Sequence, residues 1–260
     1  SLVLGKWRRR IWKQCSRCRA SNWQPFAAVA QLPAKHCSAN STSKRFILLG
    51  SSRGLGWATY QALGRAYPES AYLLLSRKIQ EKAADFFANT ECSHYDFSQG
   101  ELTEDFLRTL ENFHGTHLIY FAGGGPYGFF SRKKWSAHQW CIETTFLFPA
   151  RLLHEVLGQQ HRWASLKQII FIGSAVAENQ ADPQAASYAA AKHALKGLIT
   201  TVQQENLIAN NRQAPEILLF SPGYMQTDLL PLHSEPRQKG LAEKPEVVAE
   251  KLIAMIQKID

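Results

Sequence analysis

A glycine-rich turn between an apolar run and a helical pattern constrains the fold of this chain most strongly. The turn, Gly50-Ser51-Ser52-Arg53-Gly54-Leu55-Gly56, follows the apolar run 46–49 and precedes the stretch 55–66, whose apolar residues recur at helical spacing. A buried strand that turns on glycine into a helix presents unpaired backbone N–H groups and the positive end of the helix dipole at one point. That point suits a pyrophosphate group, because glycine lets the backbone approach a ligand closely. A tight connection without a ligand gives the same pattern, so other segments must discriminate.

The chain beyond residue 44 alternates between short apolar runs and stretches with helical spacing. The apolar runs, which we interpret as strands, are 46–49, 71–75, 92–95, 117–121, 168–172 and 216–220. The helical stretches are 55–66, 78–88, 101–113, 135–158, 187–209 and 246–258. Strands that are apolar on both faces are typical of a parallel sheet covered by helices on each side. We therefore predict an α/β fold: a doubly wound parallel sheet of Rossmann type with three layers and about six strands.

The beginning of the chain differs from the remainder in charge. The first 45 residues hold ten of the 30 Lys and Arg residues and no Asp or Glu, which leaves 20 basic against 21 acidic residues beyond them. The net charge of +9 therefore belongs to this segment. We interpret 1–43 as a basic N-terminal extension outside the core and 44–260 as a single Rossmann-type domain, which is long enough to bury a core unaided.

Other interpretations of the extension remain open. An Arg-rich leader that contains Ser and lacks acidic residues resembles an organelle transit peptide. A basic arm that carries Trp7, Trp12 and Trp23 could instead contact nucleic acid or an acidic surface. We favour an appendage outside the catalytic fold, and we do not expect a nucleic-acid partner.

Cysteine usage indicates a reducing compartment. Only two of the five cysteines lie beyond the extension, which favours an intracellular protein. Within the extension, Cys15-x-x-Cys18 and the pair His36-Cys37 could supply zinc ligands, but the second pair lacks the usual spacer, and we expect no metal site. No apolar run approaches the roughly 18 residues that span a bilayer. We expect no membrane contact and a cytoplasmic location, or an organelle matrix if the extension is a leader.

Polar or glycine-containing segments follow every predicted strand, at the sheet edge where ligands bind in parallel sheets. They are the glycine-rich turn, Ser76-Arg77-Lys78, Asp96-Phe97, Ala122-Gly123-Gly124-Gly125, Ser174 and Pro222-Gly223. Beyond Ser174, Tyr188 and Lys192 stand four residues apart on a predicted helix, so both side chains lie on one face. Each of these groups falls where a cofactor or a substrate would bind.

In their order and spacing, these residues resemble the short-chain dehydrogenase/reductase family from about Lys44 to the end of the chain. Tyr188-Ala189-Ala190-Ala191-Lys192 is similar to the Tyr-x-x-x-Lys motif of that family, and Ser174 precedes it at the expected distance. The turn, the strand ends and the resemblance together give the expected cofactor-binding residues: Gly50, Ser52, Arg53, Gly54, Leu55, Gly56, Arg77, Asp96, Phe97, Ala122, Gly123, Tyr188, Lys192, Pro222, Gly223 and Thr227. A homodimer or homotetramer that acts on a small carbonyl or alcohol is expected.

The expected chemistry is hydride transfer with proton transfer from a tyrosine. A free tyrosine with a pKa of about 10 donates or accepts protons poorly at neutral pH until positive charge lowers that pKa. The resemblance implies that Lys192 supplies this charge and binds the nicotinamide ribose, that Ser174 hydrogen-bonds the substrate oxygen, and that Tyr188 transfers the proton. The plainer alternatives are a turn-capping hydroxyl at Ser174 and a solvated helix face at Tyr188 and Lys192.

Two positions depart from the family pattern. Thr145 stands four residues before Pro149, where the family usually carries an Asn that holds a relay water, and Phe121 replaces the Asn of an Asn-Ala-Gly signature. We include Thr145 among the expected catalytic residues. Two functions stay open: an NADP-dependent oxidoreductase, which Ser174, Tyr188 and Lys192 favour, and a catalytically weak NADP-binding sensor or regulatory protein.

Positive charge near the end of the second strand predicts the choice of cofactor. A free ribose is usually held by a carboxylate about twenty residues after the glycine-rich turn, whereas a 2′-phosphate needs a cation there. Arg77 stands at that position, and Arg53 lies within the turn. We therefore expect NADPH to bind more tightly than NADH.

Aromatic and apolar residues in two loops predict the substrate pocket. The expected walls are Tyr127, Phe129, Phe130, Tyr224 and Met225, with the basic run 132–134 at the rim. Such walls indicate an apolar or aromatic carbonyl compound.

Overall fold

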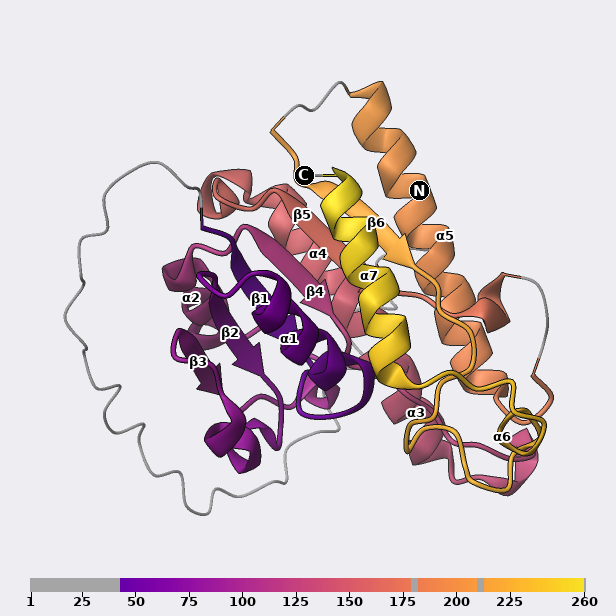
Figure 1. Ribbon diagram of the computed structural model, residues 1–260. Helices are drawn as coiled ribbons and strands as arrows, with labels where there is room; N and C mark the ends of the chain where they lie inside the picture. The colour runs from indigo at the N-terminus through magenta and orange to yellow at the C-terminus, as the bar shows by residue number, and fades with distance from the viewer. Residues whose placement is uncertain (1–42, 179–181, 210–212, 260) are drawn as a thin grey trace, which may run out of the picture. The chain divides into compact units, whose positions relative to one another are not determined.

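A computed structural model describes residues 43–178, 182–209 and 213–259 (Figure 1). The predictions of a leader, a nucleic-acid-binding arm and zinc ligands at Cys15, Cys18, His36 and Cys37 fall outside the described residues. The described part contains an all-parallel sheet with the order β3-β2-β1-β4-β5-β6, which confirms the predicted fold class. The strands are β1 (Arg45–Leu49), β2 (Ala71–Leu75), β3 (Thr90–Ser93), β4 (His117–Tyr120), β5 (Gln168–Ile172) and β6 (Glu216–Phe220).

The helices connect these strands in the expected alternation. The α-helices are α1 (Gly54–Ala66), α2 (Glu104–Phe113), α3 (Trp135–Ile142), α4 (Phe148–Gly158), α5 (Ala186–Ile208), α6 (Glu235–Gln238) and α7 (Pro245–Ile259). The short helical turns are η1 (Ile79–Asp85), η2 (Phe97–Gln99), η3 (Phe130–Arg132), the π-helical η4 (Glu143–Leu147), η5 (Gln160–Trp163) and η6 (Ala175–Ala177).

Three predicted elements differ from the observed ones. The stretch 78–88 forms only the 3-10 turn η1, and the stretch 135–158 is divided into α3, η4 and α4. The third strand starts two residues earlier than predicted, because its pairing with β2 begins at Thr90 and Glu91, whose polar side chains the apolar run does not include.

The core lies on both faces of the sheet because successive strand side chains point to opposite sides. Ile47 and Leu49 of β1 pack in a cluster with α2, α4 and α5, whereas Phe46 and Leu48 pack in a second cluster with α1 and α7. In Figure 1, α1 and α7 lie side by side in front of the sheet. Each fully buried large apolar side chain stabilises the fold by about 1.5–3 kcal/mol.

The strand order places a crevice at the carboxyl end of β1. This strand pairs with β2 on one side and with β4 on the other, so the chain reverses its direction of winding between β1 and β4. Ligands bind at such a reversal in doubly wound sheets. The loops after β1 and β4 begin side by side there, with Phe121 donating its backbone N–H to Leu49 O at 2.7 Å.

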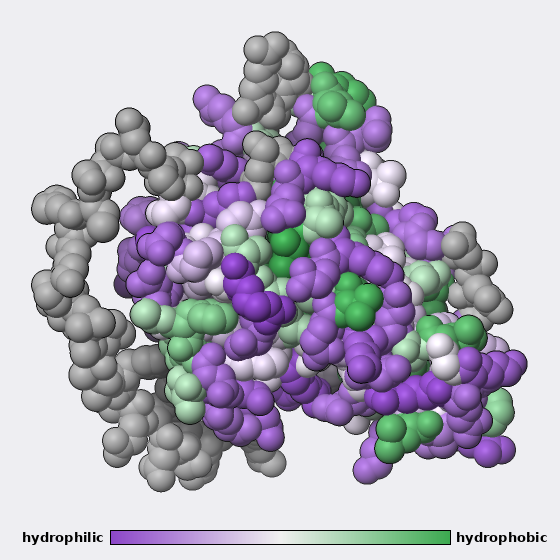
Figure 2. Space-filling model, in the orientation of Figure 1, coloured by the Kyte–Doolittle hydropathy of each residue, from purple (hydrophilic) through white to green (hydrophobic). Residues whose placement is uncertain are grey.

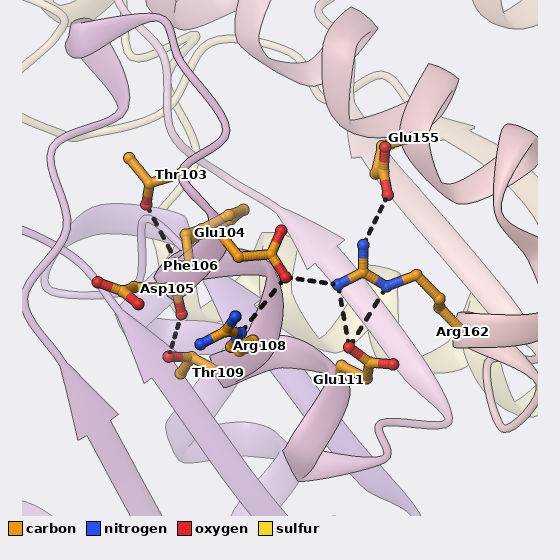
Figure 3. A network of polar contacts seen from close by, with 9 residues as sticks. All are labelled: Thr103, Glu104, Asp105, Phe106, Arg108, Thr109, Glu111, Glu155 and Arg162. Carbon is orange, nitrogen blue, oxygen red and sulfur yellow. Dashed lines mark hydrogen bonds and ion pairs between the residues drawn. The ribbon is translucent and has the colours of Figure 1, made fainter.

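A network of ion pairs connects α2, α4 and η5 (Figure 3). Arg162 of η5 pairs with Glu104 and Glu111 of α2 and with Glu155 of α4, at 3.0–3.4 Å.

The surface seen in Figure 2 is mostly hydrophilic with separate small hydrophobic patches. Of the described helices, none combines the length and apolar character needed to cross a membrane.

Candidate active site

The turn after β1 requires glycine at two positions. Gly50 has a φ of 89°, and a Cβ on it would lie 2.4 Å from the backbone nitrogen of Ala122. A Cβ on Gly56 would lie 2.6 Å from Gly50 O, so a larger residue would push α1 away from the turn. Arg53 precedes α1 without a side-chain hydrogen bond to it, and the first turn of α1 contains no acidic residue. The first N–H groups of α1 therefore stay available to an anion.

A cavity of about 960 Å³ extends from this turn across the carboxyl ends of the strands. Most of the predicted cofactor-binding residues line it: Gly50, Ser52, Arg53, Gly54, Leu55, Gly56, Arg77, Asp96, Phe97, Ala122, Gly123, Tyr188, Lys192 and Thr227. Gly223 lines a neighbouring smaller cavity instead. Pro222 lines neither cavity; it is buried, and its carbonyl accepts a hydrogen bond from Ala175 N at 2.9 Å.

The end of β2 gives the larger cavity a positively charged side. Arg77 and Lys78 line it there, next to Ser76, whose hydroxyl lies 2.7 Å from that of Ser52. Burial raises the pKa of Asp96, but hydrogen bonds from Ser98 and the positive charge of Arg77 outweigh burial and hold that pKa below its ordinary value. Asp96 is therefore ionised at neutral pH and can accept hydrogen bonds.

Three predicted catalytic side chains meet where the two cavities adjoin. Tyr188 lines both cavities, Ser174 lines the smaller and Lys192 the larger. Lys192 Nζ lies 5.4 Å from the centre of the Tyr188 ring and donates a 2.5 Å hydrogen bond to Ile172 O. All three residues are held by the carboxyl end of β5 and the first turns of α5.

Burial shifts the pKa values of Tyr188 and Lys192 in opposite directions. It raises the pKa of Tyr188 to about 12, although a hydrogen bond with Ser174 opposes the shift. It lowers the pKa of Lys192 to about 8. The sequence predicts a lowered tyrosine pKa, whereas here burial outweighs the hydrogen bond with Ser174 and the pKa is raised. The hydroxyl of Tyr188 consequently keeps its proton at neutral pH.

Thr145 lies beside the site but lines neither cavity. Its hydroxyl accepts a hydrogen bond from Gly124 N at 3.0 Å and donates one to Gly124 O at 3.1 Å. The neighbouring Thr144 does line the larger cavity, and its hydroxyl is buried without a hydrogen-bond partner among the described residues. Sequence reasoning missed Thr144, which its position next to Thr145 in the helix before Pro149 could have indicated.

The smaller cavity, of about 300 Å³, is the candidate substrate pocket. Its volume lies at the low end of the roughly 300–1,000 Å³ typical of small-molecule sites. Tyr127, Tyr224 and Met225 line it as predicted.

Two predicted pocket residues do not reach this cavity. Phe129 and Phe130 lie outside the lining and are 60% and 52% exposed, because the turn η3 directs this loop outward. The basic run 132–134 does not line the cavity either. Sequence reasoning missed lining residues in loops that carry no motif: Val176, Asp182, Leu229 and Leu230.

Comparisons with known proteins identify the family. The family model described as short chain dehydrogenase matches residues 44–237. A comparison with curated proteins gave no match. Among solved structures, an alcohol dehydrogenase from Thermococcus sibiricus, complexed with 5-hydroxy-NADP, is 23% identical, with a TM-score of 0.66 over 83% of this chain and 91% of that one. A 4-hydroxyisoleucine dehydrogenase complexed with NADH is 20% identical, with a TM-score of 0.68 over 82% of this chain and 91% of that one.

A third solved structure, BdcA in complex with NADPH, is 19% identical, with a TM-score of 0.65 over 82% of this chain and 87% of that one. At these identities, the structural matches establish the fold. The family model covers most of the chain and, together with the fold, confirms the resemblance inferred from the motifs. The chain belongs to the short-chain dehydrogenase family, whose members are oxidoreductases that act on CH–OH groups.

Proposed function

We propose that this enzyme interconverts a carbonyl compound and an alcohol with NADP as cofactor, and that Tyr188 is its proton donor and acceptor. The position of Tyr188 on both cavities carries this proposal. A cofactor in the larger cavity and a substrate in the smaller one would adjoin at this side chain. Solved structures with this fold bind NADPH or NADH, which supports a nicotinamide cofactor here.

The residues that surround the larger cavity fit such a cofactor. The N–H groups at the start of α1 suit its pyrophosphate, and the buried, unpartnered hydroxyl of Thr144 offers a hydrogen bond inside the same cavity. When bound, the cofactor supplies the hydride that adds to the carbonyl carbon.

The protein's own part in the reaction is to position the carbonyl oxygen and to protonate it. Ser174 donates a hydrogen bond to that oxygen, and Tyr188, which holds its proton at neutral pH, transfers it to the oxygen as the C–O double bond becomes single. The products are the alcohol and the tyrosinate. Lys192 stabilises the tyrosinate by its positive charge until solvent returns a proton. In alcohol oxidation, the same steps run in reverse.

Replacement of Tyr188 with Phe tests the proposal. Tyr188→Phe keeps the ring and removes the proton donor, so carbonyl reduction should fall by roughly 10²–10⁴-fold while NADPH binds as before. A screen of carbonyl compounds, followed by the loss of NADPH absorbance, gives the rate, and calorimetry gives the affinity. Phe130→Leu, at an exposed position outside both cavities, is the matched control. Equal rates for Tyr188→Phe and the parent enzyme would contradict the proposed role.

The preference for NADP is supported by the charge at the end of β2. Arg77 lines the larger cavity there, and a contact with a 2′-phosphate needs only about 1.4 kcal/mol to give a tenfold preference. NADPH should therefore bind at least about tenfold more tightly than NADH. Arg77→Ala should remove most of this difference, because it should weaken the binding of NADPH and leave that of NADH unchanged. Equal dissociation constants of the two cofactors for the parent enzyme would exclude the preference.

A cofactor-binding sensor without turnover is the second candidate. The observation that favours it is the hydroxyl of Thr145, which is bonded to Gly124 and stands outside both cavities. A sensor would bind NADPH and reduce none of the screened carbonyl compounds, and Tyr188→Phe would then change neither property.

A further inference from the structure

The smaller cavity has an acidic side chain in its wall that the proposed chemistry does not use. Asp182 is the one charged residue among the described residues that line this cavity, and it is 9% exposed. Two residues beyond Asp182, Gln184 O accepts a 2.7 Å hydrogen bond from Gly128 N, which follows the lining residue Tyr127. The fold therefore holds a carboxylate at a defined place in the substrate pocket.

The contacts of Asp182 do not require its negative charge. Oδ1 accepts a 3.0 Å hydrogen bond from Gln184 N, which is an Asx turn that an Asn would form equally well. Among the described residues, Oδ2 accepts one long hydrogen bond, 3.4 Å, from the hydroxyl of Tyr224, which also lines the cavity. A carboxylate oxygen can accept more than one hydrogen bond, so Oδ2 can still bind a donor inside the cavity.

Among the described residues, no cation is paired with this carboxylate. Arg237 of α6 does not line the cavity. Its guanidinium donates hydrogen bonds to the backbone carbonyls of the lining residues Thr227 and Leu230, at 2.7 and 3.0 Å. Burial of an unpaired charge is costly, and a ligand cation would offset the cost.

The titration of a neighbouring side chain is consistent with a negative potential in the cavity. Burial raises the pKa of Tyr127, and the negative charges of Asp182 and Glu235 raise it further. Glu235 lies on α6, where it is paired with Lys239, whereas Asp182 lines the cavity itself. A substrate with a carboxylate or phosphate group would meet repulsion here.

We propose that the substrate of this enzyme carries a protonated amino group, which Asp182 and Tyr224 bind while Ser174 and Tyr188 hold the reacting oxygen. The inference rests on the proposed function, because it takes the smaller cavity as the substrate pocket. The ammonium donates a hydrogen bond to Asp182 Oδ2, and apolar walls such as Leu230 contact the carbon chain. The substrate class is a compact amino ketone or the corresponding amino alcohol.

Three methyl ketones that differ in the charge at their far end test this proposal. They are dimethylaminopropyl methyl ketone, which is cationic, its uncharged isostere isohexyl methyl ketone, and the anion acetylbutyrate. Calorimetry with the full chain and NADP⁺ measures binding without turnover. We expect the cationic ketone to bind at least about tenfold more tightly than its isostere, as one charge-assisted hydrogen bond would give, and acetylbutyrate to bind most weakly. Equal binding of the first two ketones, or no binding of the cationic one, would overturn the proposal.

Two variants test whether the Asp182 carboxylate itself causes the preference for the cationic ketone. Asp182→Asn keeps the turn and should remove the preference for the cationic ketone while binding of the isostere stays unchanged. Glu235→Gln, the matched control, removes an exposed acid outside the lining and should keep the preference. An unchanged preference in Asp182→Asn would overturn the assignment. Should that variant not fold, Tyr224→Phe decides, since it should weaken binding of the cationic ketone alone.

The same ketones distinguish this inference from the proposed function. With NADPH present, reduction of the cationic ketone that depends on Tyr188 supports both. Binding of the cationic ketone in the expected order without any reduction would contradict the proposed function and leave the Asp182 site standing. Reduction of the isostere as efficient as that of the cationic ketone would support the function and overturn the role of Asp182.

Discussion

At the scale of single residues, Thr145 is connected to the site through the backbone of Gly124. Its two hydrogen bonds hold the N–H and the carbonyl of Gly124, and Gly123 and Gly125 on either side line the larger and the smaller cavity. A Cβ on Gly125 would lie 2.8 Å from Cys141 Sγ and 3.0 Å from Tyr188 Cβ, so this segment is closely packed against the candidate proton donor. We therefore propose that Thr145 is a positioning residue.

Removal of the Thr145 hydroxyl should disturb both stability and turnover. Thr145→Val keeps the shape but leaves two buried backbone groups of Gly124 unpaired, which should cost about 1–3 kcal/mol of unfolding free energy. Turnover should fall by about tenfold or more, since a shift of this segment misplaces the reacting groups. Thr145→Ser, which keeps the hydroxyl, is the control and should behave like the parent enzyme. Denaturant unfolding and NADPH oxidation measure the two effects, and parent-like turnover in Thr145→Val would refute the positioning role.

Single residues also mark where the sequence stops being informative. Ser174, Tyr188 and Lys192 stand in a recognisable motif, so their meeting could be predicted. Asp182 could not, because a carboxylate in a loop is ordinarily solvated, and only the fold shows that this one faces a cavity. The prediction that Phe129 and Phe130 line the pocket is wrong for the opposite reason. Aromatic character predicts burial, whereas both side chains are exposed at the turn η3.

At the scale of elements, Pro149 explains why one predicted helix is divided. Proline has no N–H to donate to the carbonyl four residues earlier, which is that of Thr145. The chain makes a π-helical turn at this point, in which Phe148 N donates to Glu143 O across five residues. This irregular turn carries both Thr144 and Thr145 at the edge of the site, as π-turns frequently do at functional positions. The sequence contains the cause, Pro149, but a periodicity argument does not register it.

The start of β4 predicts sensitivity to acid. His117 is 1% exposed and its ring contacts that of Phe46 in a tilted arrangement. Burial together with the charges of Lys44 and Lys167 lowers its pKa to about 4. The unfolded chain binds this proton near pH 6.5 and the folded protein does not, so the stability contribution is complete above pH 6.5 and is lost as the pH falls toward 4.

Acid unfolding of a His117 variant measures this contribution. Between pH 7.5 and pH 5, the parent should lose about 2 kcal/mol more unfolding free energy than His117→Phe, which keeps an aromatic ring against Phe46 and cannot titrate. Urea unfolding at the two pH values gives the comparison. His161→Phe, at an exposed position, is the control and should follow the parent. Equal losses in the parent and in His117→Phe would show that this histidine is not the acid-sensitive group.

At the scale of the whole molecule, the fold was the most predictable property. The alternation of apolar runs with helical stretches predicted the parallel sheet, because strands buried on both faces must be apolar throughout, as Leu73 and Leu74 of β2 are. The edge strand β3 was misplaced, since an edge strand needs fewer apolar side chains. The substrate pocket could be predicted only in part: Tyr127, Tyr224 and Met225 line it, but Phe129 and Phe130 do not. Its walls come from loops whose path the periodicity of the sequence does not determine.

The concentration of positive charge at the beginning of the chain leads to a prediction about the first 42 residues. Within the described residues, the two hydrophobic clusters and the sheet are built from Arg45 onward. A polar, basic segment buries little apolar surface, so its removal should change the melting temperature by less than about 2 °C and the NADPH dissociation constant by less than about twofold. Calorimetric melting and binding of the full chain and of residues 43–260 measure both. A full-length variant with Trp7, Trp12 and Trp23 changed to Ala is the matched control: a drop of more than about 5 °C in both proteins would mean that these tryptophans pack on the domain or on a second copy of it.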